Sequence, residues 1–147
     1  MPLDSVWAQW YRRALPAYWI FLFSVTHLPF LRLDVPVPSS DKLAHLVAFG
    51  LLAFLFWRFV EALGRPLSGR FVYIAAFWLF AYGAFDEYLQ QFVGRSTDLD
   101  DWLCDVGGSA VVLVLLEWRR RKTRPRGSNR RFWSWRLWSS WLCCSIS

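Results

Sequence analysis

A short acidic stretch interrupts the most apolar part of this chain. Residues 85–105 read FDEYLQQFVGRSTDLDDWLCD and hold six carboxylates and one basic residue, Arg95. Carboxylate oxygens are the ligands that Mg²⁺ and Ca²⁺ prefer, and a pair of carboxylates can also act as general acid and general base. Arg95 together with Lys42 could clamp a phosphate. The candidate metal ligands in this stretch are Asp86, Glu87, Asp101 and Asp105.

Helix capping explains some of these acids but not all of them. The carboxylates at positions 98, 100 and 101 precede or open a predicted helix, where free backbone amides and the helix dipole favour negative charge. Asp86 and Glu87 instead lie near the carboxyl end of the preceding predicted helix, where the dipole opposes negative charge. These two carboxylates need another source of compensation, for which the candidates are Arg95, Lys42, His45 and a bound cation.

Three polar motifs fall at the same end of the predicted helices. DKLAH opens the second apolar segment, DEYLQ closes the third, and GRSTDLDDWLCD leads into the fourth. Ionisable groups inside apolar helices are costly and usually face a cavity or a partner. We therefore predict one polar site, built from Asp41, Lys42, His45, Asp86, Glu87, Gln90, Arg95, Asp101 and Asp105. The chain contains no Ser-His-Asp order, Gly-rich phosphate loop, HExxH or GxSxG motif, so common hydrolase and nucleotide-binding mechanisms have no support.

The elements that must position these residues are predicted to be membrane-spanning helices. The chain of 147 residues is 56% hydrophobic and 20% aromatic, which sets it apart from an ordinary soluble domain. Of four apolar segments, the second and fourth approach the length of about 20 residues that crosses a bilayer, and the first and third reach it only with polar flanking residues. The four segments are residues 14–30, 43–60, 71–85 running on towards 91, and 99–118. Because small residues in the third and fourth segments allow close approach of backbones, we predict an all-α transmembrane four-helix bundle in which those two segments touch.

Basic residues indicate how the bundle is oriented. Of the 17 Lys and Arg residues, all but Arg32, Lys42 and Arg95 fall in the N-terminal segment, the middle loop or the tail. Loops rich in Lys and Arg resist translocation, so both termini should be cytoplasmic. Most acidic residues fall in or beside the other two loops. The predicted polar site therefore faces outward.

These patterns divide the chain into three regions. We expect a cytoplasmic juxtamembrane segment at 1–13, the membrane domain at 14–118, and a basic, Trp-rich cytoplasmic tail at 119–147 that is disordered or lies at the membrane interface. The first apolar segment has no small-x-small cleavage site after it and is expected to be an uncleaved span. The expected partner is the lipid bilayer, and no nucleic acid is expected. The three Cys residues show no spacing typical of a disulfide framework or zinc site.

The combination of motifs resembles a known family. DKLAHLVAFGLLAFL and YGAFDEYLQQFVGRSTDLDDWLCDVGGSA are similar to VanZ-like membrane proteins, which carry a DKxxH opening, a DExxQ element, a Gly-Arg turn and spaced acids before a Gly. The resemblance covers residues 41–110 and adds Gly94 and Gly108 to the site residues. Leu89 stands where the family often has His, and the turn at Val93-Gly94 lacks the family's Pro. The resemblance implies a multi-pass protein of the bacterial cytoplasmic membrane, linked to low-level glycopeptide resistance of the teicoplanin type, and implies no reaction.

Three functions fit these residues. In the first, the outward-facing acids and Arg95 bind an envelope component, such as a lipid-linked glycan or phosphate. In the second, the protein is a membrane enzyme that acts on such a lipid carrier by metal-assisted or acid/base chemistry, with a divalent cation as candidate cofactor and with its catalytic residues unassigned. In the third, the charges form salt bridges that lock a structural membrane scaffold without a ligand.

Overall fold

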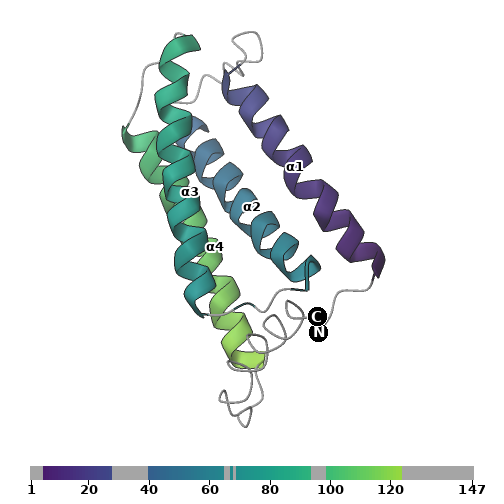
Figure 1. Cartoon of the computed structure of the whole chain (residues 1–147). Coiled ribbons are helices and arrows are strands. Elements are labelled where there is room, and N and C mark those ends of the chain that lie inside the picture. Colours follow the sequence, from purple (N-terminus) through teal and green to yellow (C-terminus); the bar gives the residue numbers. More distant parts are fainter. Residues whose placement is uncertain (1–4, 28–39, 65–66, 68, 94–98, 124–147) are drawn as a thin grey trace, which may run out of the picture.

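Four long α-helices make up the described part of the protein (Figure 1). The computed structural model describes residues 5–27, 40–64, 67, 69–93 and 99–123. The helices are α1 (Ser5–His27), α2 (Ser40–Ala62), α3 (Gly69–Gln90) and α4 (Leu99–Thr123), and the short 3-10 helix η2 (Gln91–Val93) follows α3. No strand occurs among these residues, so the prediction of an all-α fold is confirmed for them.

The helices extend beyond the predicted apolar segments. Helix α1 begins at Ser5 rather than at residue 14, and α4 continues to Thr123 rather than to residue 118. The early part of α1 is held against α2, because the ring of Tyr11 packs edge-on against Phe54 and the guanidinium of Arg58 lies 4.9 Å from the centre of the Tyr11 ring. Hydropathy marks the apolar part of a helix only, whereas such contacts also stabilise its polar end.

Consecutive helices run in alternating directions (Figure 1). Helix α2 packs most extensively against α4, α1 lies on α2, and α3 lies on α4. The predicted contact between the third and fourth segments is therefore confirmed. The alternation brings the last turns of α1 and α3 together with the first turns of α2 and α4. We call this the acidic end, defined by His27, His45, Asp86, Glu87, Asp101 and Asp105, and we call the opposite end the basic end.

A glycine permits the close contact between α2 and α4. A Cβ atom added to Gly108 would overlap the carbonyl oxygen of Leu46 and lie 2.9 Å from its carbonyl carbon. On the other helix, a Cβ added to Gly50 would lie 3.5 Å from the carbonyl oxygen of Gly108. A Cβ on Gly107 would meet no described atom within 4 Å. Gly108 therefore brings α4 close to α2, as small residues do between helices in lipid.

Apolar side chains fill the middle of the bundle. Phe49, Ala53 and Leu113 are almost completely buried, and the ring of Tyr82 stacks on Phe49 with centroids 5.7 Å apart. The buried cluster draws on all four helices and contains Leu15, Leu22, Phe49, Leu52, Ala53, Leu55, Trp57, Ala75, Leu79 and Leu113. This core lies between the acidic end and the basic end.

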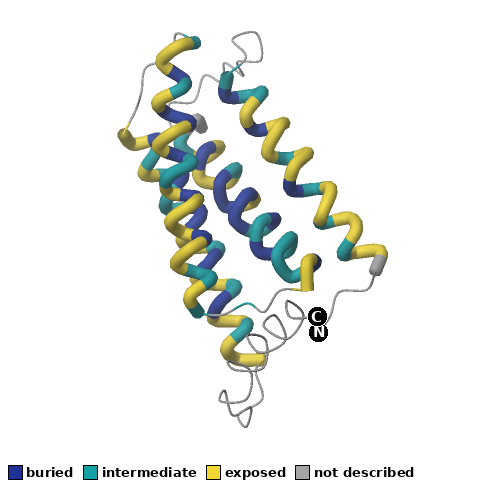
Figure 2. The backbone as a smooth tube through the Cα atoms, viewed as in Figure 1, coloured by how far each residue is buried: buried dark blue, intermediate teal, exposed yellow. Residues whose placement is uncertain are grey.

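Much of the outer side of the helices is exposed (Figure 2), and many of the exposed residues there are large and apolar. On α3, Tyr73 and Phe77 are 77% and 64% exposed, and Ile20 of α1 and Val114 of α4 are exposed to a similar degree. Exposed side chains of this kind occur on all four helices.

One helix in the described part of the chain is long and apolar enough to cross a bilayer by length and composition alone. It covers Lys42–Ala62 of α2. The other helices have 22 to 25 residues, but α1 contains two arginines, α3 two acids and α4 several charges at both ends. These residues lower the mean hydropathy without shortening the helices. The four-span arrangement and the orientation of the termini stay predictions.

Arginine side chains bind backbone carbonyl oxygens at the basic end. Arg12 donates hydrogen bonds of 2.6 and 3.1 Å to the carbonyl oxygen of Ala62, the last residue of α2. Arg120 of α4 donates a 2.8 Å bond to the carbonyl oxygen of Leu67 and pairs with Glu117 at 2.6 Å. Hydrogen bonding to Glu117 raises the pKa of Arg120. Arg12 thus satisfies a carbonyl oxygen that the end of α2 leaves without an intrahelical partner, whereas Leu67 lies between α2 and α3.

Some predictions fall outside the described residues. The outer loop at 28–39, the Gly-Arg turn with Arg95, the cap at Asp98 and most of the tail lie there. The division into regions at residues 13 and 118 also stays a prediction.

Candidate functional site

The acidic end gathers buried polar side chains from different helices. The DKLAH motif lies in the first turns of α2, DEYLQ in the last turns of α3, and DLDDWLCD mostly in the first turns of α4. Six predicted site residues are buried there: His45, Asp86, Glu87, Gln90, Asp101 and Asp105. An interior that holds this many ionisable groups requires hydrogen bonds or counter-charges for each of them.

His45 lies between two acids of α4. Its Nδ1 is 3.0 Å from Oδ1 of Asp105, and its Nε2 is 3.9 Å from Oδ2 of Asp101. Because an ionised carboxylate only accepts hydrogen bonds, the contact with the fully buried Asp105 favours the tautomer that carries its proton on Nδ1. The lone pair of Nε2 then faces Asp101.

Asp86 is surrounded by donors from α1 and α3. Gln90 donates a 2.8 Å hydrogen bond from its side-chain amide to Oδ2. The hydroxyl groups of Thr26 and Tyr82 donate to Oδ1 over 3.4 and 3.5 Å, and Nδ1 of His27 lies 3.8 Å from the same oxygen. These groups compensate a carboxylate that the dipole of α3 disfavours.

Three of these partners are missing from the predicted site, namely Thr26, His27 and Tyr82. The compensators that the sequence suggested for Asp86 were Arg95, Lys42, His45 or a cation, whereas the described contacts come from neutral donors and a histidine. Thr26 and His27 are polar residues near the predicted outer end of the first apolar segment. Their position is the sequence feature from which they could have been assigned to the site. Tyr82 precedes Asp86 by four residues, which places both on one helix face.

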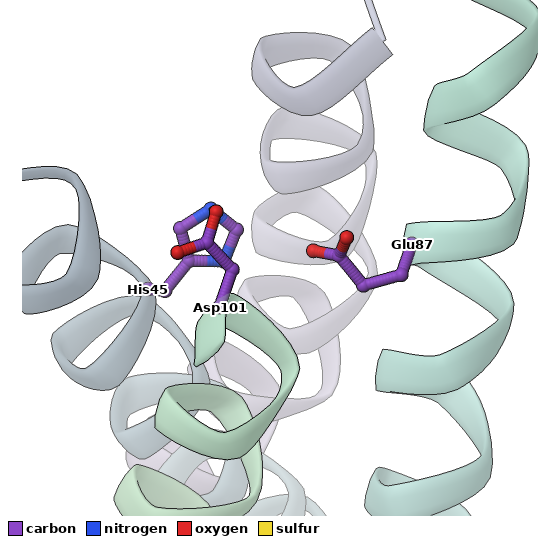
Figure 3. Close-up of side chains that lie close together, drawn as sticks. All are labelled: His45, Glu87 and Asp101. Atoms are coloured by element: carbon purple, nitrogen blue, oxygen red, sulfur yellow. The ribbon is translucent and has the colours of Figure 1, made fainter. Parts of the chain in front are cut away.

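Glu87 of α3 faces His45 of α2 and Asp101 of α4 (Figure 3). One potential ligand atom from each of these three residues lies within 4.8 Å of the other two, and all three residues are buried. In the close-up, the Glu87 carboxylate points towards the His45 and Asp101 side chains. An imidazole and two carboxylates are ligand types that divalent metals use.

Buried polar atoms without a hydrogen-bond partner among the described residues include Oδ2 of Asp105 and Nε2 of His27. Both atoms belong to the acidic end. Buried polar atoms in native proteins are nearly always paired, so such exceptions indicate water, an ion or a ligand.

Lys42 contacts the rim of the site rather than its buried layer. It forms an ion pair with Asp100, and the side chains of the two residues are 42% and 61% exposed. The side chain of the adjacent Asp101 is only 12% exposed. Helix capping accounts for the exposed Asp100, whereas Asp101 turns inward to His45.

The remaining predicted site residues are placed only in part. The backbone of Asp41 belongs to the first turn of α2, and its side chain lies outside the described residues. Gly94 and Arg95 also lie outside them. Gly108 has a structural role, because it permits the contact with Leu46.

A comparison with protein families shows the family to which the chain belongs. A family model described as VanZ/LLP1 matches residues 1–120. The chain belongs to the VanZ/LLP1 family. The match includes α1 and nearly all of α4, and the VanZ-like resemblance of the polar motifs is confirmed. No curated protein and no solved structure matched this VanZ-like chain.

Proposed function

We propose that this VanZ-like protein spans the bacterial cytoplasmic membrane several times and binds a component of the cell envelope at its outward-facing acidic end. The observation that carries the proposal is that ionisable side chains lie inside the bundle while apolar side chains lie on its outside. Four carboxylates and the imidazole of His45 are buried at the acidic end, whereas large aromatic and aliphatic side chains are exposed on the exterior. A lipid environment accommodates such an exterior, and ionisable groups buried within it are by default part of a functional site.

The charge at the two ends supports the outward orientation. The basic end carries Arg12, Arg13, Arg58 and Arg70 together with the basic run from Arg119 to Lys122. Segments rich in Lys and Arg remain on the cytoplasmic side of the membrane. The acidic end then faces the compartment in which the cell envelope is assembled.

The chemistry of the acidic end suits the headgroup of a lipid-linked glycan. Carboxylates accept hydrogen bonds, and sugar hydroxyls donate them. Lys42 at the rim supplies a cation that can approach a headgroup phosphate. An apolar groove between α3 and α4 could hold the lipid chain, and its lining residues are Ala76, Phe77, Phe80, Val106, Ser109 and Ala110.

Topology can be tested by cysteine labelling in whole cells. In a variant whose native Cys residues are replaced by Ser, we expect Asp100→Cys to react with a membrane-impermeant maleimide, because Asp100 lies exposed at the acidic end. Arg119→Cys, exposed at the basic end, should react only after the membrane is permeabilised. Labelling of both positions in intact cells, or of Arg119→Cys alone, would contradict the orientation.

The binding site can be tested by its effect on glycopeptide susceptibility. In a teicoplanin-sensitive host, we expect the wild-type protein to raise the minimum inhibitory concentration of teicoplanin. We expect the Glu87→Gln variant to leave it at the value measured for cells that carry the empty vector. The substitution keeps the size of the buried side chain and removes its charge, so it acts on ligand binding more than on packing.

Glu61→Gln is the matched control for this experiment. Glu61 is half-buried at the basic end, where it pairs with Arg58 at 2.5 Å, and this variant should retain the wild-type resistance. Both variants must reach wild-type amounts in the membrane fraction. If Glu87→Gln confers the same resistance as the wild-type protein, the acidic end is not the binding site.

A further inference from the structure

We propose that the acidic end holds one divalent transition-metal ion, with Zn²⁺ as the preferred ion, on Nε2 of His45 and one carboxylate oxygen each of Glu87 and Asp101. The proposal deepens the proposed function, because the ion would occupy the same acidic end. The three ligands come from α2, α3 and α4 (Figure 3). The ion would therefore also link three helices of the bundle.

The spacing of the three ligands is close to that of a bound ion. A tetrahedral site with bonds of about 2.0–2.2 Å holds its ligand atoms about 3.3–3.6 Å apart. Nε2 of His45 and Oδ2 of Asp101 are 3.9 Å apart, and all three ligand atoms lie within 4.8 Å of one another. Binding therefore requires the ligand atoms to approach one another by about 1.5 Å at most.

Asp105 prepares His45 to act as a ligand. Its Oδ1 is 3.0 Å from Nδ1 of His45, and its side chain has no exposed surface. Metal-binding histidines almost always donate their other ring N–H to a carboxylate or carbonyl group, which sets the tautomer and orients the ring. This hydrogen bond turns the Nε2 lone pair towards Asp101, the residue that supplies the next ligand.

The charge of the buried layer also favours a cation. Asp86, Glu87, Asp101 and Asp105 are buried at this end, whereas the described part of the chain places only Lys42 there among its Lys and Arg residues, at the exposed rim. The two histidines can offset part of this negative charge. A divalent cation would add two positive charges beside these four carboxylates in a poorly solvated interior.

The ligand types favour a transition metal over Mg²⁺ or Ca²⁺. Those two ions take sets of six or more oxygen ligands, including carbonyl groups and water. The imidazole of His45 is instead a ligand for Zn²⁺ and related first-row ions. Three protein ligands leave a coordination position for a ligand oxygen, as in zinc sites that act on substrates.

The test measures metal binding by the purified full chain in detergent micelles after removal of metals with a chelator. We expect the wild-type protein to bind one Zn²⁺ per chain in equilibrium dialysis and to give a Co²⁺ absorption spectrum that Zn²⁺ abolishes. Asp101→Asn and Glu87→Gln should each weaken binding by about tenfold or more, and Asp105→Asn should weaken it by about 10- to 100-fold through the orientation of His45.

Asp100→Asn is the matched control, because Asp100 is adjacent in sequence but exposed and paired with Lys42. It should bind Zn²⁺ with an affinity close to that of the wild-type protein. Asp101→Asn preserves side-chain size near the helix start, and circular dichroism and gel filtration establish that each variant is folded. Absence of Zn²⁺ binding by the wild-type protein, equal affinity of the Asp101→Asn and Asp100→Asn variants, or displacement of Zn²⁺ by equimolar Mg²⁺ would each overturn the metal site.

The metal site and the proposed function can be tested separately, because either one can be wrong without the other. If Glu87→Gln abolishes glycopeptide resistance while the wild-type protein binds no Zn²⁺, the acidic end binds its envelope ligand without a metal and only the metal site is wrong. If Zn²⁺ binds with the expected pattern but resistance is unaffected by Glu87→Gln, the metal site stands and the proposed function is wrong.

Discussion

Replacing Gly108 with alanine is expected to lower the free energy of unfolding by about 3 kcal/mol, because the added methyl group overlaps backbone atoms that cannot move aside alone. The methyl carbon would overlap the carbonyl oxygen of Leu46 and lie 3.1 Å from its Cα atom. Relief requires α2 and α4 to separate along the most extensive interface of the bundle. The separation would also move His45 away from Asp105, so the acidic end should open with the interface.

Gly107→Ala provides a control on the same helix turn. An added Cβ at position 107 meets no described atom within 4 Å, and alanine favours helix more than glycine does by about 1 kcal/mol. This variant should be as stable as the wild-type protein or slightly more stable. Thermal unfolding of the purified proteins in detergent, followed by circular dichroism, measures both effects. Equal unfolding temperatures for the two variants would show that α2 and α4 are not in close backbone contact.

The second large effect is expected for Asp86→Ala, which removes the acceptor of a buried hydrogen-bond network. The amide of Gln90 loses a 2.8 Å bond, and the hydroxyl groups of Thr26 and Tyr82 lose their contacts with the same carboxylate. Leaving the buried amide of Gln90 unpaired costs about 1–3 kcal/mol, whereas the hydroxyl of Thr26 keeps the carbonyl oxygen of Phe23 as an acceptor at 3.2 Å. We expect a loss of about 2–3 kcal/mol in the free energy of unfolding, since the amide contact is short and the two hydroxyl contacts are long.

Two further variants identify the cause of that loss. Asp86→Asn retains an oxygen acceptor of the same shape and should recover part of the stability, whereas Asp100→Ala removes an exposed partner of Lys42 and should cost less than about 1 kcal/mol. Denaturant titration in mixed micelles can rank the three variants. If Asp86→Ala is no less stable than Asp100→Ala, the contacts around Asp86 contribute nothing measurable to folding.

Helix number and the ends at which polar residues gather could be predicted from local patterns. Apolar segments separated by loops predict helices, and alternation of basic and acidic loops places DKLAH, DEYLQ and the start of the fourth segment at one end. In the structure, the corresponding side chains His45, Glu87 and Asp105 are indeed buried at a common end. The exact helix ends could not be predicted, because side-chain contacts such as that of Arg12 with Ala62 extend α1 past its apolar part.

The partners of each buried carboxylate could not be predicted. Asp86 and Glu87 are adjacent in the sequence and looked equivalent, but successive residues on a helix point about 100° apart. Asp86 turns to Thr26 and His27 of α1, whereas Glu87 turns to His45 and Asp101. The same rotation separates the exposed Asp100 from the buried Asp101.

The sequence by itself determined an all-α, VanZ-like fold with most of its acids at one end, because the apolar segments, the charge alternation and the motif order are local properties of the chain. Only the tertiary structure decided which acids pair with which helices. The pairing depends on how each helix is rotated and how far apart the helices lie. At Gly108, it depends on the close contact between the backbones of α2 and α4, which a single methyl group would prevent. The candidate zinc ligands became recognisable because three helices bring His45, Glu87 and Asp101 within 4.8 Å of one another.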